Sequence, residues 1–263
     1  MEERQTYFWR IFATGACFVL FGIGGLILGL LVFPAMLLLP GEPAQGRARL
    51  RNLVQRAFHL FVWVMNGVGG ISYEFHGSER LGRPGQLIIA NHPTLVDVVL
   101  IVAFTPAPCC VIKAAMFRNP FTRSVVRAAG YISNSPTDEM IHGAAAALRS
   151  GDALVMFPEG TRTRPGQPLH FLRGAASVAV HAADVLTPVY IRCEPLVLPK
   201  FVPWYRVPSQ RPHFTLEVGE DIDLAAYRGL PPPRASRLLN DWLLGHYTER
   251  LATSDGYNGT PGN

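Results

Sequence analysis

A histidine and an aspartate interrupt an otherwise apolar run, IIANHPTLVDVV, at residues 88–99. Polar side chains in such surroundings are costly unless they are hydrogen-bonded or functional. His92 and Asp97 are five residues apart, which on one continuous helix would place them about 140° apart. Because proline favours the first helical position, we expect Pro93 to begin a helix, with His92 just before it and Asp97 in its second turn. The side chain of His92 then folds back to reach the carboxylate.

A carboxylate on one imidazole nitrogen fixes the tautomer and stabilises the cation that forms when the other nitrogen accepts a proton. This pair is therefore typical of a general base. The sequence has no G-x-S-x-G elbow, and none of its four cysteines lies in a recognisable catalytic context. A base without an enzyme nucleophile indicates a substrate that brings its own, such as a hydroxyl. The spacing by itself is not specific, and an ordinary core histidine is the competing interpretation.

The second candidate is FPEGTRTRPG, residues 157–166, which directly follows an apolar run. If that run is a buried strand, the motif lies at its carboxyl end, where ligand sites of α/β proteins are found. Glu159 supplies a carboxylate, Gly160 permits a close approach of the backbone, and Arg162 can hold two oxygens of a phosphate. The competing interpretation is a tight surface turn with a solvated arginine.

Together, NHPTLVD and FPEGTRT resemble the glycerolipid acyltransferase family, whose motifs are N-H-x4-D and F-P-E-G-T-R-S. Its members are membrane enzymes that acylate lysophosphatidic acid and related lysolipids, as 1-acylglycerol-3-phosphate acyltransferases do. The resemblance covers about residues 70–195 in the family's order. AAGYISN (128–134) stands in place of the family's G-x-x-F-I-x-R block, and LTPVYI (186–191) is similar to its fourth block.

The resemblance implies a role for each matching residue. His92 would deprotonate the acceptor hydroxyl and Asp97 would orient His92. The acyl donor would be acyl-CoA or an acyl carrier protein, and neither a metal nor an organic cofactor is implied. The residues implied in binding substrate, with Arg162 on an anionic head group, are Asn91, Glu159, Gly160, Thr161 and Arg162.

Asn134 departs from the family pattern, which has arginine there. A charge-assisted hydrogen bond to phosphate contributes about 1.5–3 kcal/mol, more than a neutral amide supplies. Asn134 and Lys113 are the residues we consider for further head-group contacts. The acceptor is thus either a lysophosphatidic acid-like lipid or a different hydroxyl compound, such as a lyso-ornithine lipid or an aryl polyene precursor. Hydrolysis of an acyl thioester and a non-catalytic adaptor role also stay open.

An uncharged segment from Ile11 to Leu39 precedes these motifs. As one helix it would be about 43 Å long, against about 30 Å for the hydrocarbon of a bilayer. It either spans the bilayer with a tilt or breaks at Pro34 and returns as a hairpin. Glu2 and Glu3 argue against a secretory signal peptide. More arginines follow the segment than precede it, which predicts that the rest of the chain lies in the cytoplasm, at the inner membrane.

The remaining pattern predicts an α/β domain with a mostly parallel central sheet flanked by helices. The resemblance implies that this is the glycerolipid acyltransferase fold. Residues 1–68 are interpreted as a membrane anchor and an amphipathic helix (47–70) that lies on the bilayer or in the core. Residues 69–252 are expected to form the acyltransferase domain, and residues 253–263 a disordered tail. Predicted strands are 71–77, 86–91, 108–114, 153–160, 186–193 and 213–222, and predicted helices are 93–104, 119–130, 138–151, 173–183 and 235–251.

The 263-residue chain carries a formal charge of +5. With an anchor, this charge suits an anionic leaflet better than nucleic acid, and no basic stripe with interleaved aromatic residues indicates a nucleic-acid site. The Pro- and aromatic-rich stretch PKFVPWYRVP (199–208) has three interpretations: a cover over an acyl channel, a contact with the membrane, or an ordinary loop.

Overall fold

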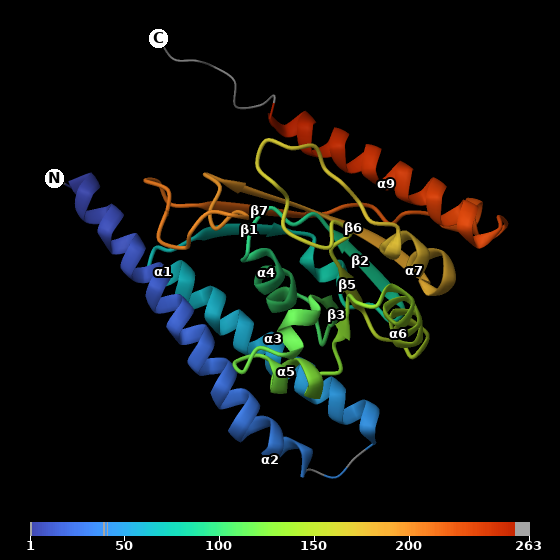
Figure 1. Cartoon of the computed structure of the whole chain (residues 1–263), viewed down its shortest axis with the longest axis horizontal. Coiled ribbons are helices and arrows are strands. Elements are labelled where there is room, and N and C mark those ends of the chain that lie inside the picture. The colour runs from blue at the N-terminus through green and yellow to red at the C-terminus, as the bar shows by residue number, and fades with distance from the viewer. Residues whose placement is uncertain (1, 39, 41, 256–263) are drawn as a thin grey trace.

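The computed structural model describes residues 2–38, 40 and 42–255 (Figure 1). The last helix, α9 (Pro232–Asp255), continues three residues into the segment for which a disordered tail is predicted. The rest of that tail, 256–263, lies outside the described residues.

Within the described residues, seven strands form one sheet in the order β1-β7-β6-β2-β5-β3-β4. Every neighbouring pair is parallel except β6 and β7, which are antiparallel. The predicted mostly parallel sheet is therefore confirmed. The strands are β1 (Ser72–His76), β2 (Gln86–Ala90), β3 (Cys109–Ile112), β4 (Ile132–Ser133), β5 (Leu154–Met156), β6 (Val185–Glu194) and β7 (His213–Val218).

The helices flank this sheet, as predicted, but two begin four residues later than the sequence indicates. The predicted helix 119–130 is helical only from Arg123 to Ala128, and the predicted helix 93–104 begins at Asp97. The helices before α9 are α1 (Glu2–Ile27), α2 (Phe33–Leu37), α3 (Pro43–Gly67), α4 (Asp97–Phe104), α5 (Arg123–Ala128), α6 (Thr137–Arg149), α7 (Gly174–Ala182) and α8 (Ala225–Arg228), with short turns η1 (Leu28–Val32), η2 (Ser78–Arg80) and η3 (Ala114–Phe117).

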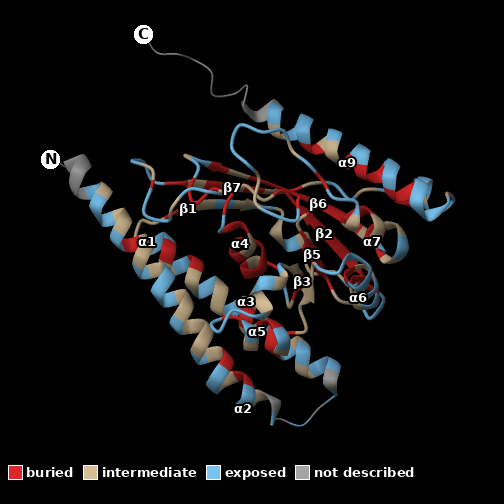
Figure 2. Cartoon of the chain, in the orientation of Figure 1, coloured by how far each residue is buried: buried red, intermediate tan, exposed pale blue. Residues whose placement is uncertain are grey.

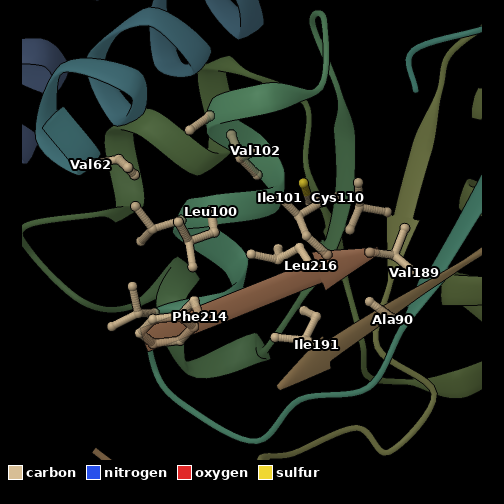
Figure 3. Packing of buried hydrophobic residues seen from close by; sticks show 14 of the residues in the cluster. Val62, Ala90, Leu100, Ile101, Val102, Cys110, Val189, Ile191, Phe214 and Leu216 are labelled. Carbon is tan, nitrogen blue, oxygen red and sulfur yellow. The ribbon is translucent and has the colours of Figure 1, made fainter. Parts of the chain in front are cut away.

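The core lies on both faces of the sheet. Successive residues of β2 are all buried and alternate between two clusters, Ile88 and Ala90 on one face, Leu87 and Ile89 on the other. A strand buried on both faces reads as a continuous apolar run, as β2 does. Helices α3 and α4 cover the first face and α6, α7 and α9 the second (Figure 2). In Figure 3, Leu100 and Ile101 of α4 pack between the sheet and Val62 of α3.

The apolar N-terminal segment forms one long helical unit made of α1, η1 and α2. The sequence predicts either a continuous helix or a break at Pro34, and the helix does not break there. The π-helical turn η1 intervenes, in which the Phe33 N–H donates to the carbonyl of Leu28, and α2 follows with Pro34 in its first turn. Proline lacks the N–H that would continue the helical hydrogen bonds, and the π-helical turn directly before it accommodates that gap. The chain reverses only after Leu37, and α3 returns beside α1 (Figure 1).

Helix α3 corresponds to the predicted amphipathic helix and packs against α4 with one face. Leu50, Val54 and Val62 are buried in the core, whereas Leu60 and Trp63 are exposed. Glycine after the helix permits the turn out of it, since Gly69 has φ +76°. One face of α3 is thus a core face, and its other face carries the exposed apolar residues.

Candidate active site

The two motifs meet at the carboxyl edge of the parallel strands. Strands β2 and β5 are hydrogen-bonded neighbours in the sheet. Asn91 and His92 follow β2, and the 157–163 turn follows β5. This edge is where parallel α/β sheets place their ligands, because the loops that leave neighbouring strands converge there.

His92 and Asp97 are in contact, as the sequence predicts, but not by the predicted route. Nδ1 of His92 lies 2.9 Å from Oδ2 of Asp97. Residues 91–96 are not helical, and Asp97 is the first residue of α4 rather than a member of its second turn. The prediction that Pro93 begins the helix is therefore wrong.

Thr94 explains this local structure. Its N–H and hydroxyl donate to the two oxygens of the Asp97 carboxylate, at 2.7 and 2.6 Å, and its hydroxyl oxygen accepts from the N–H of Val96 at 3.1 Å. Such side-chain bonds compete with the helical pattern and hold residues 94–96 in a turn. Thr94 is not among the residues predicted for the site, although a threonine three residues before an acidic residue is a known signal for the start of a helix.

The imidazole of His92 is held on both its edge and its face. Asp97, fully buried, accepts from Nδ1, and the ring of Phe157 lies 4.5 Å from the imidazole centroid. The His92 side chain remains 14% exposed. With the proton on Nδ1, the lone pair of Nε2 lies on the far side of the ring from Asp97 and can accept a proton from a bound molecule.

Glu159 joins the two motifs. Its Oε1 accepts from the backbone N–H of His92 at 2.8 Å and from the hydroxyl of Thr163 at 2.9 Å. The N–H of Thr163 also donates to the carbonyl of His92, at 2.7 Å. Burial raises the pKa of the Glu159 carboxyl, and the hydrogen bonds from His92 and Thr163 oppose this shift. Glu159 thus fixes the backbone that carries the base.

Asn91 fixes the same backbone from the opposite side. Its amide nitrogen donates to the carbonyl of Ile191 and its amide oxygen accepts from the N–H of Ile191, both at 2.8 Å. Ile191 belongs to β6, the other neighbour of β2. These contacts tie the end of β2 to β6, and the predicted role of Asn91 in binding substrate stays a prediction.

The 160–162 turn presents three predicted residues in different settings. Gly160 has φ +65°, a backbone conformation that favours glycine, and a Cβ there would lie 2.7 Å from Cδ1 of Leu172. Thr161 is exposed. Nη1 of Arg162 donates to the carbonyls of Leu198 and Pro199, at 2.8 and 3.2 Å. The guanidinium therefore links this turn to the loop after β6.

Lys113 and Asn134 follow β3 and β4, at the same edge but beyond β5 from His92. Lys113 is exposed. Oδ1 of Asn134 accepts from the N–H of Ala114 at 3.0 Å, and its own N–H donates to the carbonyl of Ile112. Asn134 thus holds the chain where it leaves β3.

The residues at this edge do not favour thiol or metal chemistry. Cys193, near the end of β6, is buried, and desolvation, with a smaller contribution from the charge of Asp97, raises the pKa of its thiol to about 12. A thiol with that pKa is protonated at neutral pH and is a poor nucleophile. Among the described residues, no group of three or more His, Cys, Asp or Glu side chains could hold a metal ion.

The comparison with family models identifies the part of the chain that contains this α/β sheet and its His–Asp site. Residues 72–192, from β1 to β6, match the model of the acyltransferase family. This part of the chain contains both motifs, so its similarity to the acyltransferase family includes the candidate active site.

Among the curated proteins similar to this chain are three named 1-acyl-sn-glycerol-3-phosphate acyltransferase. The chain is 26% identical to that of Pseudomonas aeruginosa over 149 residues, 54% of this chain and 58% of the relative. It is 28% identical to that of Borreliella burgdorferi over 151 residues, again 54% and 58%. The chain is 30% identical to that of Helicobacter pylori over 117 residues, which are 42% of this chain and 48% of the relative. The matched stretches therefore span about half the length of these relatives.

A solved structure resembles nearly the whole chain. The crystal structure of the 1-acyl-sn-glycerophosphate (LPA) acyltransferase PlsC from Thermotoga maritima superposes with a TM-score of 0.69 and 18% identity. The match covers 95% of this chain and 98% of that one. At this identity the similarity shows a shared fold, including the helices before the sheet.

Proposed function

We propose that this protein transfers a fatty acyl group from a thioester donor to a hydroxyl of a lysolipid of the lysophosphatidic acid type. The observation that carries the proposal is the His92–Asp97 pair at the carboxyl edge of an acyltransferase-family sheet, which leaves Nε2 to act on a substrate. The names of the relatives, all 1-acyl-sn-glycerol-3-phosphate acyltransferases, support the lysolipid acceptor.

In this mechanism Nε2 of His92 takes the proton of the acceptor hydroxyl, and Asp97 stabilises the imidazolium that forms. The hydroxyl oxygen attacks the thioester carbonyl, the C–S bond breaks, and the proton on His92 passes to the departing thiolate. The products are an ester and the free thiol of the carrier, either coenzyme A or acyl carrier protein. No metal or organic cofactor takes part. General-base catalysis of this kind contributes about 10²- to 10⁴-fold in rate.

The test is acyl transfer from acyl-CoA to lysophosphatidic acid by purified membranes that contain the His92→Ala variant. We expect activity to fall at least a hundredfold while the protein remains at its normal level. His76→Ala, at an exposed histidine on the outer strand β1, is the matched control and should keep full activity. Transfer by His92→Ala at the normal rate would contradict the proposal. If the wild-type protein releases free fatty acid instead of forming an ester, it is a thioester hydrolase.

A second acceptor class is favoured by Asn134. Its carbonyl oxygen already binds the N–H of Ala114, and its amide carries no charge for a phosphate. The alternative acceptor is a lysolipid without a phosphate, such as a lyso-ornithine lipid, or an aryl polyene precursor. Rates measured with a panel of phosphate and non-phosphate acceptors of equal chain length separate the two classes.

The proposed site of action is the membrane surface. The helical stretch from Thr6 to Met36 is long and apolar enough to span a bilayer, a test that core helices and signal sequences also pass, and 11% of its most apolar window is buried. However, small residues of α1 and η1 pack against the catalytic domain along much of this length. A Cβ on Gly25 would lie 2.5 Å from the carbonyl oxygen of Phe121, and one on Gly29 2.8 Å from Ser124.

We therefore favour a helix that lies along one leaflet, since a helix crossing the bilayer would draw the polar domain beside it into the hydrocarbon. The arginines after the segment favour the cytoplasmic leaflet of the inner membrane, because its anionic lipids attract basic residues at the surface. Protease treatment of spheroplasts tests this placement: a C-terminal tag should be protected unless the membrane is permeabilised.

A further inference from the structure

The loop between β6 and β7 carries an exposed apolar cluster that the proposed chemistry does not use. We call residues 196–205 the aromatic loop. Val197, Leu198 and Pro199 are buried and fix its base, whereas Phe201, Val202, Trp204 and Tyr205 are exposed. The exposed fraction of Phe201 is 78%. Clustered apolar surface of this kind marks a contact with a protein or a membrane.

The backbone of the aromatic loop is conformationally strained where it presents these side chains. Leu198 and Phe201 both have positive φ, +48° and +68°, a region that disfavours residues with a Cβ. Such conformations persist where the surrounding structure enforces them, and they concentrate at functional segments. Arg162 supplies part of that enforcement by donating to the carbonyls of Leu198 and Pro199.

The aromatic loop is continuous with the apolar helix α1. The ring of Trp204 lies 6.1 Å from that of Phe18, and a Cβ on Gly15 would lie 3.2 Å from the indole. Figure 1 shows the orange segment between β6 and β7 beside the N-terminal half of α1, with α9 on the other side of the sheet. A membrane or protein surface that contacts this part of α1 therefore also contacts the aromatic loop.

The charged side chains between Pro195 and Pro212 are all basic. From Pro195 to Pro212 the chain has Lys200, Arg206 and Arg211 and no acidic residue. The Lys200 ammonium and the Arg164 guanidinium lie 5.1 and 5.7 Å from the centre of the Phe201 ring. Tryptophan and tyrosine beside basic side chains are the composition that proteins place at the headgroup layer of an anionic leaflet.

We propose that the aromatic loop is a second lipid-contacting element, which inserts Phe201 and Trp204 into the headgroup layer beside α1. This inference rests on the proposed membrane association. Because Arg162 binds the loop and belongs to the turn after β5, the docked loop holds the candidate active site next to the bilayer surface.

The first test measures quenching of tryptophan fluorescence by brominated lipids. The full chain has four tryptophans, and three are replaced by phenylalanine to leave one reporter at Trp9, Trp204 or Trp242. Each protein is reconstituted into vesicles of phosphatidylcholine and phosphatidylglycerol. Trp204 and Trp242 are 46% and 43% exposed, so Trp242 on α9 is a control of matched exposure. We expect quenching of Trp9 and Trp204 and little of Trp242.

Each outcome of this test is decisive. Quenching of Trp9 without that of Trp204 overturns the inference alone and leaves membrane association standing. No quenching of Trp9, together with failure to co-sediment with vesicles, overturns both. If the loop instead contacts a second copy of the chain, Trp204 stays unquenched and Phe201→Ser changes the oligomeric state in detergent.

The second test keeps all four tryptophans and replaces one exposed loop residue, so that folding is not at stake. Phe201→Ser should speed the transfer of the protein from donor to acceptor vesicles about tenfold, as expected for the loss of one buried aromatic side chain. Leu238→Ser, at an exposed position of α9, should leave the rate unchanged. Equal rates for wild type and Phe201→Ser would contradict the proposal.

Discussion

The backbone N–H of His92 donates to Oε1 of Glu159 across 67 residues of sequence, at 2.8 Å. This bond fastens the turn after β5 to the residue that carries the proposed base. The sequence motifs predict that both residues act on the substrate. In the structure Glu159 acts on the protein, by fixing where His92 stands.

The first prediction concerns stability against pH. Burial raises the pKa of the Glu159 carboxyl in the folded protein, so the folded state keeps its proton to higher pH than the unfolded state. Stability from this difference is present below the ordinary pKa and is lost as the pH rises through the raised one. Glu159→Gln abolishes the titration. We expect the free energy of unfolding of wild type to fall relative to Glu159→Gln as the pH rises from about 4.5.

Denaturant melts of the two proteins in detergent, taken at several pH values, measure this difference. Glu217→Gln is the control, because its carboxylate is bound by Arg250 near the surface and has no such burial. Parallel curves for wild type and Glu159→Gln would contradict the prediction.

The second prediction concerns Thr94, whose hydroxyl bonds to Oδ1 of Asp97 at 2.6 Å. Thr94→Val keeps the shape and removes that bond. A hydrogen bond to a charged group contributes about 1.5–3 kcal/mol, so we expect kcat to fall about tenfold to a hundredfold. The KM for the acyl donor should change little, because Thr94 is buried behind Asp97. Thr94→Ser restores the hydroxyl and should restore kcat, and a serine variant as slow as the valine variant would argue against this role.

The third prediction uses two glycines of one loop. Gly160 and Gly166 have φ +65° and +71°, but only Gly160 has a neighbour, Leu172, where a Cβ would stand. Alanine at either position costs about 1–2 kcal/mol for the left-handed backbone. Gly160→Ala must also displace Leu172 or the turn that carries Glu159. We expect Gly160→Ala to lower acyl-transfer activity at least tenfold and Gly166→Ala to leave it near wild type, although both lower the melting temperature.

The elements of this fold could be predicted from sequence because their signals are local. The apolar run of β2, the alternation in β7 and the glycine that ends α6 each depend on near neighbours. The contact between His92 and Asp97 could be predicted as well. The path of the backbone between these two residues could not be predicted, because the hydrogen bonds from Thr94 to Asp97 outweigh the preference of Pro93 for a helix start.

The roles of the polar residues were harder to predict because their partners are distant backbone groups. Asn91 bonds to Ile191, and Arg162 bonds to the carbonyls of Leu198 and Pro199. Which carbonyls are within reach depends on how β6 and the aromatic loop pack, and no spacing in the sequence encodes that. A motif thus shows which residues meet at a site, whereas the structure shows which of them face the protein and which face the substrate.

The fourth prediction concerns Arg51, which joins α3 to the catalytic domain. Its side chain is buried, forms an ion pair of 2.7 Å with Asp152, and donates to the carbonyl of Ala129 at 2.8 Å. Breaking a buried pair costs about 3–5 kcal/mol, and the 29% exposure of Asp152 reduces that cost. We expect Arg51→Met to lower the free energy of unfolding by about 2–3 kcal/mol in detergent. Arg56→Met, at an exposed position of α3, should have little effect, and adding Asp152→Asn to Arg51→Met should recover part of the loss.

The last prediction tests the acceptor through Asn134. The Asn134→Arg variant places a guanidinium at the end of β4, where the family pattern has arginine. It also removes the bond from the N–H of Ala114 to Oδ1 of Asn134, which destabilises the start of η3 slightly. If the wild-type protein lacks a phosphate contact there, the new charge should raise kcat/KM for lysophosphatidic acid about tenfold, the value of one charge-assisted hydrogen bond.

Asn134→Ala is the control that separates these effects, because it removes the same bond without adding a charge. We expect Asn134→Ala to lower activity on phosphate and non-phosphate acceptors by the same factor. Asn134→Arg should instead shift the ratio of the two toward phosphate. An unchanged ratio would show that the head group does not reach β4, and the selectivity for the acceptor would then have to come from residues nearer His92.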